Sequence, residues 1–125
     1  FLYRLDLSYN NINHRAEQFH FLELFEPGPQ TLISTLTIDN NELHINLTIL
    51  SRVPFLTIFY ADNNNIYGTL DWLGSLDLLR FCTLQNNKLG GNIPNSLGYL
   101  KQLQKFEIDV LNYCGIGISP HSNNF

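Results

Sequence analysis

The chain has 125 residues, of which 44% are hydrophobic and 13% aromatic, a composition that suits one packed domain and not a disordered segment. Charged residues make up only 14% of the sequence, and the net charge of -4 with scattered lysines and arginines argues against a nucleic-acid-binding surface. No stretch approaches the roughly 18 to 20 consecutive apolar residues that a membrane span requires, so we expect no membrane contact by this segment.

The first predicted element is a short strand near residue 2. Its apolar residues alternate with polar ones, which is typical of a strand with one buried face. An asparagine and a further apolar residue follow, so that this copy of the pattern consists of Leu2, Leu5, Leu7, Asn10 and Ile12. The sequence contains no methionine. We therefore expect that Phe1 is not the original N-terminus and that the chain is a fragment.

The second predicted element is a helical insertion at about residues 14–30. Residues 14–25 are typical of a short helix, which the Pro27-Gly28-Pro29 sequence would end. Its several phenylalanines and leucines are too apolar to lie free in water. We expect them to pack over the outer side of the first coil, and a partner-docking surface is the alternative.

The strand pattern then recurs, with copies starting at about residues 33, 56, 79 and 103. The copies follow L-x-x-L-x-L-x-x-N-x-L, with the ninth-position asparagines Asn10, Asn41, Asn64 and Asn87, except that the fifth copy has Leu111 in place of asparagine. One coil alone cannot bury its apolar face, so we expect the coils to stack around a shared core. A side-chain amide at the turn can satisfy backbone groups that the bend leaves unpaired, and stacked copies would form a ladder of asparagines.

The segments between the strands are also patterned. Residues 84–103 are typical of a strand, a bend, a second short extended piece and a half-turn. Gly68 and Gly91 occupy the same repeat position, where we expect a tight backbone bend. Apolar residues six and three positions before the next copy are predicted to point inward on the return side of each coil: Leu50, Val53, Leu73, Leu76, Leu97 and Leu100.

These motifs resemble the plant-type leucine-rich repeat, L-x-x-L-x-L-x-x-N-x-L-x-G-x-I-P-x-x-L-G-x-L, which residues 79–100 match almost throughout. The second copy departs from it, because Ile45 replaces the glycine, and the fifth lacks its asparagine. The resemblance implies an α/β repeat fold: a curved right-handed solenoid with a parallel sheet on its concave face. Residues 1–113 would form five repeats, and residues 114–125 a divergent cap or a frayed tail.

Leucine-rich repeat proteins bind ligands through the exposed strand positions of the concave face. In this chain Ile58, Tyr60 and Phe81 are predicted to be neighbours on that face, flanked by Thr37 and Thr83. An aromatic and aliphatic cluster within a polar surround is typical of a binding hot spot. Ordinary cross-strand packing that stabilises the sheet is the alternative.

Two aspartates, Asp39 and Asp62, are predicted to stand side by side on the same face, with Asp109 two coils further on. They could attract a basic ligand or hold a weak cation. A solvated acidic stripe is the alternative.

Other residues give little chemistry. Cys82 occupies an inward position and is predicted to be a buried, inert thiol, and a disulfide to Cys114 is not expected. Asn46-Leu47-Thr48 is an N-glycosylation sequon, so Asn46 is the site to test if the chain is extracellular. The four histidines lack metal-ligand spacing, and we predict neither a metal site nor a cofactor.

No catalytic constellation is recognisable, so we do not expect an enzyme. The resemblance implies a protein-recognition module: part of a receptor-like ectodomain, extracellular or at the cell surface, that binds a protein or peptide. The alternative is an intracellular, cytoplasmic scaffold or adaptor, which the absence of paired cysteines would favour.

Overall fold

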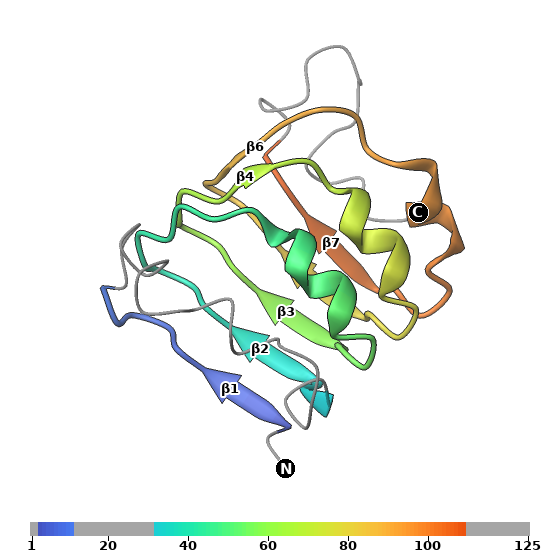
Figure 1. Ribbon diagram of the computed structural model, residues 1–125, viewed down its shortest axis with the longest axis horizontal. Coiled ribbons are helices and arrows are strands. Elements are labelled where there is room, and N and C mark those ends of the chain that lie inside the picture. Colours follow the sequence, from blue (N-terminus) through green and yellow to red (C-terminus); the bar gives the residue numbers. More distant parts are fainter. Residues whose placement is uncertain (1–2, 12–31, 110–125) are drawn as a thin grey trace.

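The computed structural model describes residues 3–11 and 32–109. The predicted helix within residues 14–30 and the predicted cap or tail at 114–125 lie outside these described residues. The main element is a parallel sheet with the strand order β1-β2-β3-β5-β7 (Figure 1). Its strands are β1 (Arg4–Asp6), β2 (Thr35–Thr37), β3 (Ile58–Tyr60), β5 (Phe81–Thr83) and β7 (Lys105–Glu107).

The strands pair in one continuous register. Each begins two residues after a predicted repeat start, so equivalent positions of successive repeats lie opposite each other. The middle residue of each strand points inward, and Leu36, Phe59 and Cys82 are 0% exposed while Phe106 is 1% exposed. The predicted stacking of these residues in a common core is therefore confirmed.

Short 3-10 helices form the return side of the coils, opposite the sheet (Figure 1). They are η4 (Leu47–Arg52), η5 (Asp71–Ser75) and η6 (Asn95–Tyr99). Leu50, Leu73 and Leu97 point from them into the core and are at most 2% exposed, as the repeat pattern predicted. The core between sheet and helices thus runs through the stacked coils without a break.

A second, two-stranded parallel sheet pairs successive coils through the segments that connect each main-sheet strand to the helix after it. It consists of β4 (Tyr67–Gly68) and β6 (Lys88–Leu89), and a single bridge from Asn46 to Tyr67 extends it toward the preceding coil. The bends predicted at the two glycines are confirmed, because Gly68 and Gly91 have φ values of 99° and 84°. The second extended piece of each coil therefore also contributes to the stacking.

The ninth-position asparagines form the expected ladder. Asn41, Asn64 and Asn87 are each only 7% exposed. The Nδ2 of Asn64 donates to the carbonyl of Ile38 in the preceding coil at 2.9 Å, and its Oδ1 accepts from the backbone N–H of Leu43 at 3.1 Å. Asn87 bonds in the same way to the Ala61 carbonyl and the Ile66 N–H, whereas Asn41 bonds to the Leu7 carbonyl and the Asn10 N–H. Each amide also donates to a carbonyl of its own coil, so it satisfies backbone groups of two coils at once.

The eighth repeat position has a backbone conformation that the pattern did not reveal. Tyr9, Asn40, Asn63 and Asn86 all lie in the left-handed region, with φ between 58° and 61°. Asparagine adopts this region more readily than other residues that carry a side chain. The three asparagines also bond to one another, Asn63 to Asn40 at 2.8 Å and Asn86 to Asn63 at 2.6 Å. A second, exposed ladder therefore runs beside the buried one.

Candidate ligand-binding surface

The outward side chains of the main sheet form one surface, which we call the strand wall. It comprises the third, fifth and seventh positions of each repeat: Arg4, Asp6, Ser8, Thr35, Thr37, Asp39, Ile58, Tyr60, Asp62, Phe81, Thr83, Gln85, Lys105, Glu107 and Asp109. Because side chains alternate along a strand, these residues point away from the core. Backbone hydrogen bonds between successive coils hold this sheet together, such as the bond from the Ile38 N–H to the Tyr60 carbonyl at 2.8 Å.

An apolar cluster lies at the centre of the strand wall. Ile58 and Phe81 are register partners on adjacent strands, and Tyr60 follows Ile58 on the same face of β3. All three side chains are half-buried. The guanidinium carbon of Arg80 lies 5.3 Å from the centre of the Phe81 ring, a cation–π distance. The predicted adjacency of these three residues is confirmed.

The two threonines of the predicted site differ in accessibility. Thr37 is half-buried, and its hydroxyl donates to the Asp6 carboxylate at 2.7 Å. Thr83 is only 4% exposed, so the prediction that it is an exposed wall residue is wrong. It stands in register between Tyr60 and Glu107, whose longer side chains flank it. The expected contact surface is therefore narrower at β5 than the repeat pattern indicates.

The aspartates of the strand wall have a structural role that the sequence did not show. Asp39 Oδ1 accepts from the backbone N–H of Asp62 at 2.7 Å, and Asp62 Oδ1 accepts from that of Gln85 at 2.7 Å. Asp109 accepts from the N–H of Asn86 at 2.6 Å. Each carboxylate thus binds a neighbouring coil just beyond the end of its strand, a structural role that was not among the predicted ones.

Burial raises the pKa of both Asp39 and Asp62 above the ordinary aspartate value. Desolvation is the largest cause for each, because it disfavours the charged carboxylate. The backbone hydrogen bonds oppose this shift, whereas neighbouring carboxylates add to it, Asp62 acting on Asp39 and Glu107 acting on Asp62. Like charges are therefore crowded along this edge of the strand wall.

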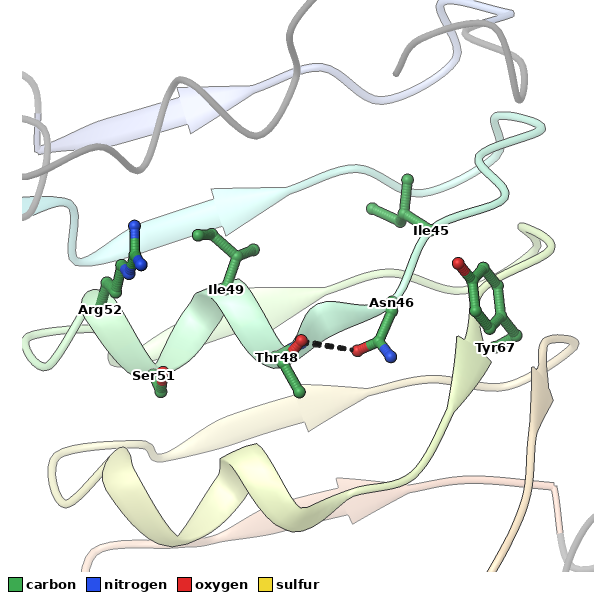
Figure 2. A pocket seen from close by; sticks show the side chains of 7 residues that line it. All are labelled: Ile45, Asn46, Thr48, Ile49, Ser51, Arg52 and Tyr67. Atoms are coloured by element: carbon green, nitrogen blue, oxygen red, sulfur yellow. Dashed lines mark hydrogen bonds between the residues drawn. The ribbon is translucent and has the colours of Figure 1, made fainter.

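A second candidate surface is a hollow of about 370 Å³ beside η4, separate from the strand wall. Figure 2 shows its lining: Ile45, Asn46, Thr48, Ile49, Ser51, Arg52 and Tyr67. The Tyr67 ring also packs on His44, with ring centres 4.6 Å apart. None of the residues predicted to bind ligand on the strand wall lines this hollow.

The hollow contains the predicted glycosylation residue. Asn46 caps η4, and its Oδ1 accepts from both the N–H and the hydroxyl of Thr48 at 2.9 Å (Figure 2). Its amide packs closely on Gly68, because a Cβ added there would lie 3.1 Å from Asn46 Nδ2. Asn46 is therefore a half-buried structural residue as well as a sequon residue.

Three further observations on the described residues concern metal ligands, the free thiol and membrane-spanning helices. In residues 3–11 and 32–109, no group of three histidines, cysteines or carboxylates is placed to hold a metal ion. Cys82 is a free, fully buried thiol, and burial raises its pKa. No helix of this part of the chain has the length and apolarity that crossing a membrane requires.

Comparison with known proteins shows the fold. No protein family model and no curated protein matches the sequence. Among solved structures, the leucine-rich repeat ectodomain of the receptor kinase SOBIR1 from Arabidopsis thaliana is similar over 63% of this chain and 44% of that chain, with 22% identity and a TM-score of 0.56. The plant peptide hormone receptor RGFR1, in complex with RGF2, is similar over 68% of this chain and 14% of that chain, with 21% identity and a TM-score of 0.60. The chain therefore has the leucine-rich repeat fold, and it matches less than half the length of either receptor.

Proposed function

We propose that this chain is a protein-recognition module, part of a leucine-rich repeat receptor-like ectodomain, that binds a protein or peptide on its strand wall. The observation that carries the proposal is the apolar cluster of Ile58, Tyr60 and Phe81, which lies on a rigid sheet among polar neighbours. A few well-packed side chains, aromatic ones above all, provide most of the free energy of binding at protein interfaces. The RGFR1 structure, which contains a peptide, supports a peptide ligand.

The proposal is tested by selecting random 12-residue peptides that bind the 125-residue chain and measuring their affinity for variants. Tyr60→Ala and Phe81→Ala should each weaken binding at least about ten-fold, as expected for hot-spot residues. Tyr99→Ala is the matched control, because Tyr99 is 78% exposed but belongs to η6 on the return side. Peptides whose binding depends on Tyr99 and not on the apolar cluster would overturn the proposed site.

We place the module outside the cell or at the cell surface, with an intracellular scaffold as the alternative. Expression with a secretion signal in eukaryotic cells tests whether Asn46 carries a glycan. A mass shift that glycosidase removes and that Asn46→Gln abolishes would support this modification. A secreted chain without a glycan would contradict the predicted modification. We expect partial modification at most, because the Asn46 amide packs closely on Gly68.

A further inference from the structure

The charges of the strand wall are sorted along the strand direction. At the third repeat position, where the strands begin, the charged residues are basic: Arg4 and Lys105. At the fifth and seventh positions, toward the strand ends, they are all acidic. We call this second set the acidic band; it consists of Asp6, Asp39, Asp62, Glu107 and Asp109. A ligand on the wall therefore meets positive charge on one side and negative charge on the other.

The acidic band has few cationic partners within the part of the chain that the structure describes. Among the residues that the structure describes, one ion pair involves it, between Lys105 Nζ and Glu107 at 3.5 Å on the β7 side. Asp39 and Asp62, at the centre of the wall, are half-buried, and each engages its Oδ1 with a backbone N–H of the next coil. Such hydrogen bonds favour the charged carboxylate but do not neutralise it. The mutual repulsion of neighbouring carboxylates would be relieved by a cation from outside.

The apolar cluster lies directly beside the central part of this band. Asp62 follows Tyr60 by two residues, just beyond the end of β3, a separation of roughly 6.5 to 7 Å in extended chain. Two residues of an extended peptide span the same distance. One ligand segment can therefore place an apolar side chain on the cluster and a cationic side chain on Asp39 and Asp62 together.

We propose that the ligand is a peptide segment in which an aromatic or branched aliphatic residue stands within about three positions of a lysine or arginine. The apolar residue rests on Ile58, Tyr60 and Phe81, and the cation lies between the Asp39 and Asp62 carboxylates. This inference rests on the proposed function and specifies its ligand class. Charge complementarity of this kind selects partners and raises association rates.

The test uses the same selected 12-residue peptides. We expect lysine or arginine to be enriched close to an aromatic or aliphatic residue. Replacing that basic residue by glutamate should weaken binding by at least about ten-fold, because like charges then face each other across the interface. Affinity for the unaltered chain should also fall when NaCl is raised from 50 to 500 mM, a readout that needs no variant.

Variants of the acidic band complete the test. Asp39→Asn/Asp62→Asn keeps oxygen acceptors for both backbone N–H groups, and it should reduce the preference for lysine over glutamate to below about three-fold. Asp71→Asn/Asp77→Asn removes the same charge from exposed positions on the return side and should leave the preference unchanged. Peptides that need Tyr60 and Phe81 but show no basic preference would overturn this inference alone. Failure to obtain any peptide that depends on the apolar cluster would overturn the proposed function as well.

Discussion

The adjacent asparagines of the second, third and fourth repeats have two different structural roles. The first, such as Asn63, accepts a left-handed backbone at φ 61° and remains exposed. The second, Asn64, turns inward and is 7% exposed. The first role needs a residue that tolerates positive φ, and the second needs an amide that both donates and accepts. One residue type therefore meets two unrelated physical demands.

The buried role is testable at Asn64. Asn64→Ala would leave the Ile38 carbonyl and the Leu43 N–H without this amide partner. We expect the free energy of unfolding to fall by about 2 to 4 kcal/mol, because buried polar groups that lose a partner carry their full desolvation cost. Chemical denaturation measures this change. Asn92→Ala, at an exposed asparagine of the following coil, is the control and should change stability by less than about 0.5 kcal/mol.

The left-handed role is testable at Tyr9. This tyrosine has φ 59° in the position that asparagine occupies in the next three coils. Tyr9→Asn should raise the free energy of unfolding by about 1 kcal/mol, because asparagine tolerates this backbone at lower cost. Tyr99→Asn is the control, since both tyrosines are 78% exposed and only Tyr9 has positive φ. Equal effects of the two substitutions on the melting temperature would contradict the argument.

At the scale of the elements, the strand ends are held by carboxylates whose protonation is linked to folding. The pKa of Asp39 and Asp62 is raised in the folded chain, chiefly by desolvation. Their contribution to the free energy of unfolding therefore increases as the pH falls through these raised values. Asp6 behaves oppositely: hydrogen bonds, first of all from Thr37, lower its pKa, so its contribution is lost on acidification.

Asp39→Asn/Asp62→Asn separates these two effects. At pH 7 the variant avoids the cost of holding two partly desolvated charges. We therefore expect any stability advantage of the variant over the unaltered chain to shrink as the pH is lowered from 7 toward the ordinary aspartate pKa of 3.8. Denaturant unfolding at several pH values measures the difference. A difference that grows on acidification would show that the backbone hydrogen bonds outweigh desolvation.

The sequence predicted the strands and the inward residues because both follow from a strict repeat period. Leu36, Phe59 and Phe106 could be assigned to the core from spacing alone. The burial of Thr83 could not, because its register neighbours, Tyr60 and Glu107, belong to two other coils. The bonds from backbone N–H groups to the aspartates were missed for a similar reason, since the partners lie in a neighbouring coil.

At the scale of the whole molecule, the stacked core should open as a unit around its middle coils. Cys82 is 0% exposed and lies on β5, between two other strands of the sheet. In a Cys114→Ser variant it is the only thiol of the chain. We expect a thiol reagent to label the folded variant at least about a thousand-fold more slowly than the unfolded one, because labelling requires global unfolding. Labelling within ten-fold of the unfolded rate would show that the coils open singly.

The bond from each ladder asparagine to the coil before it has a consequence for how such a chain can change in length. Asn41, Asn64 and Asn87 each reach the equivalent carbonyl one coil back, at Leu7, Ile38 and Ala61 respectively, and all three distances are 2.9 Å. Deletion of residues 56–78 would remove one whole coil, including both members of the edge-to-face pair Phe59 and Trp72. The Asn87 amide would then face the Ile38 carbonyl, which is equivalent to its present partner. Deleting a single strand residue instead would exchange inward and outward side chains beyond that point. Duplication or loss of whole coils should therefore destabilise the fold less than deletion of a single residue.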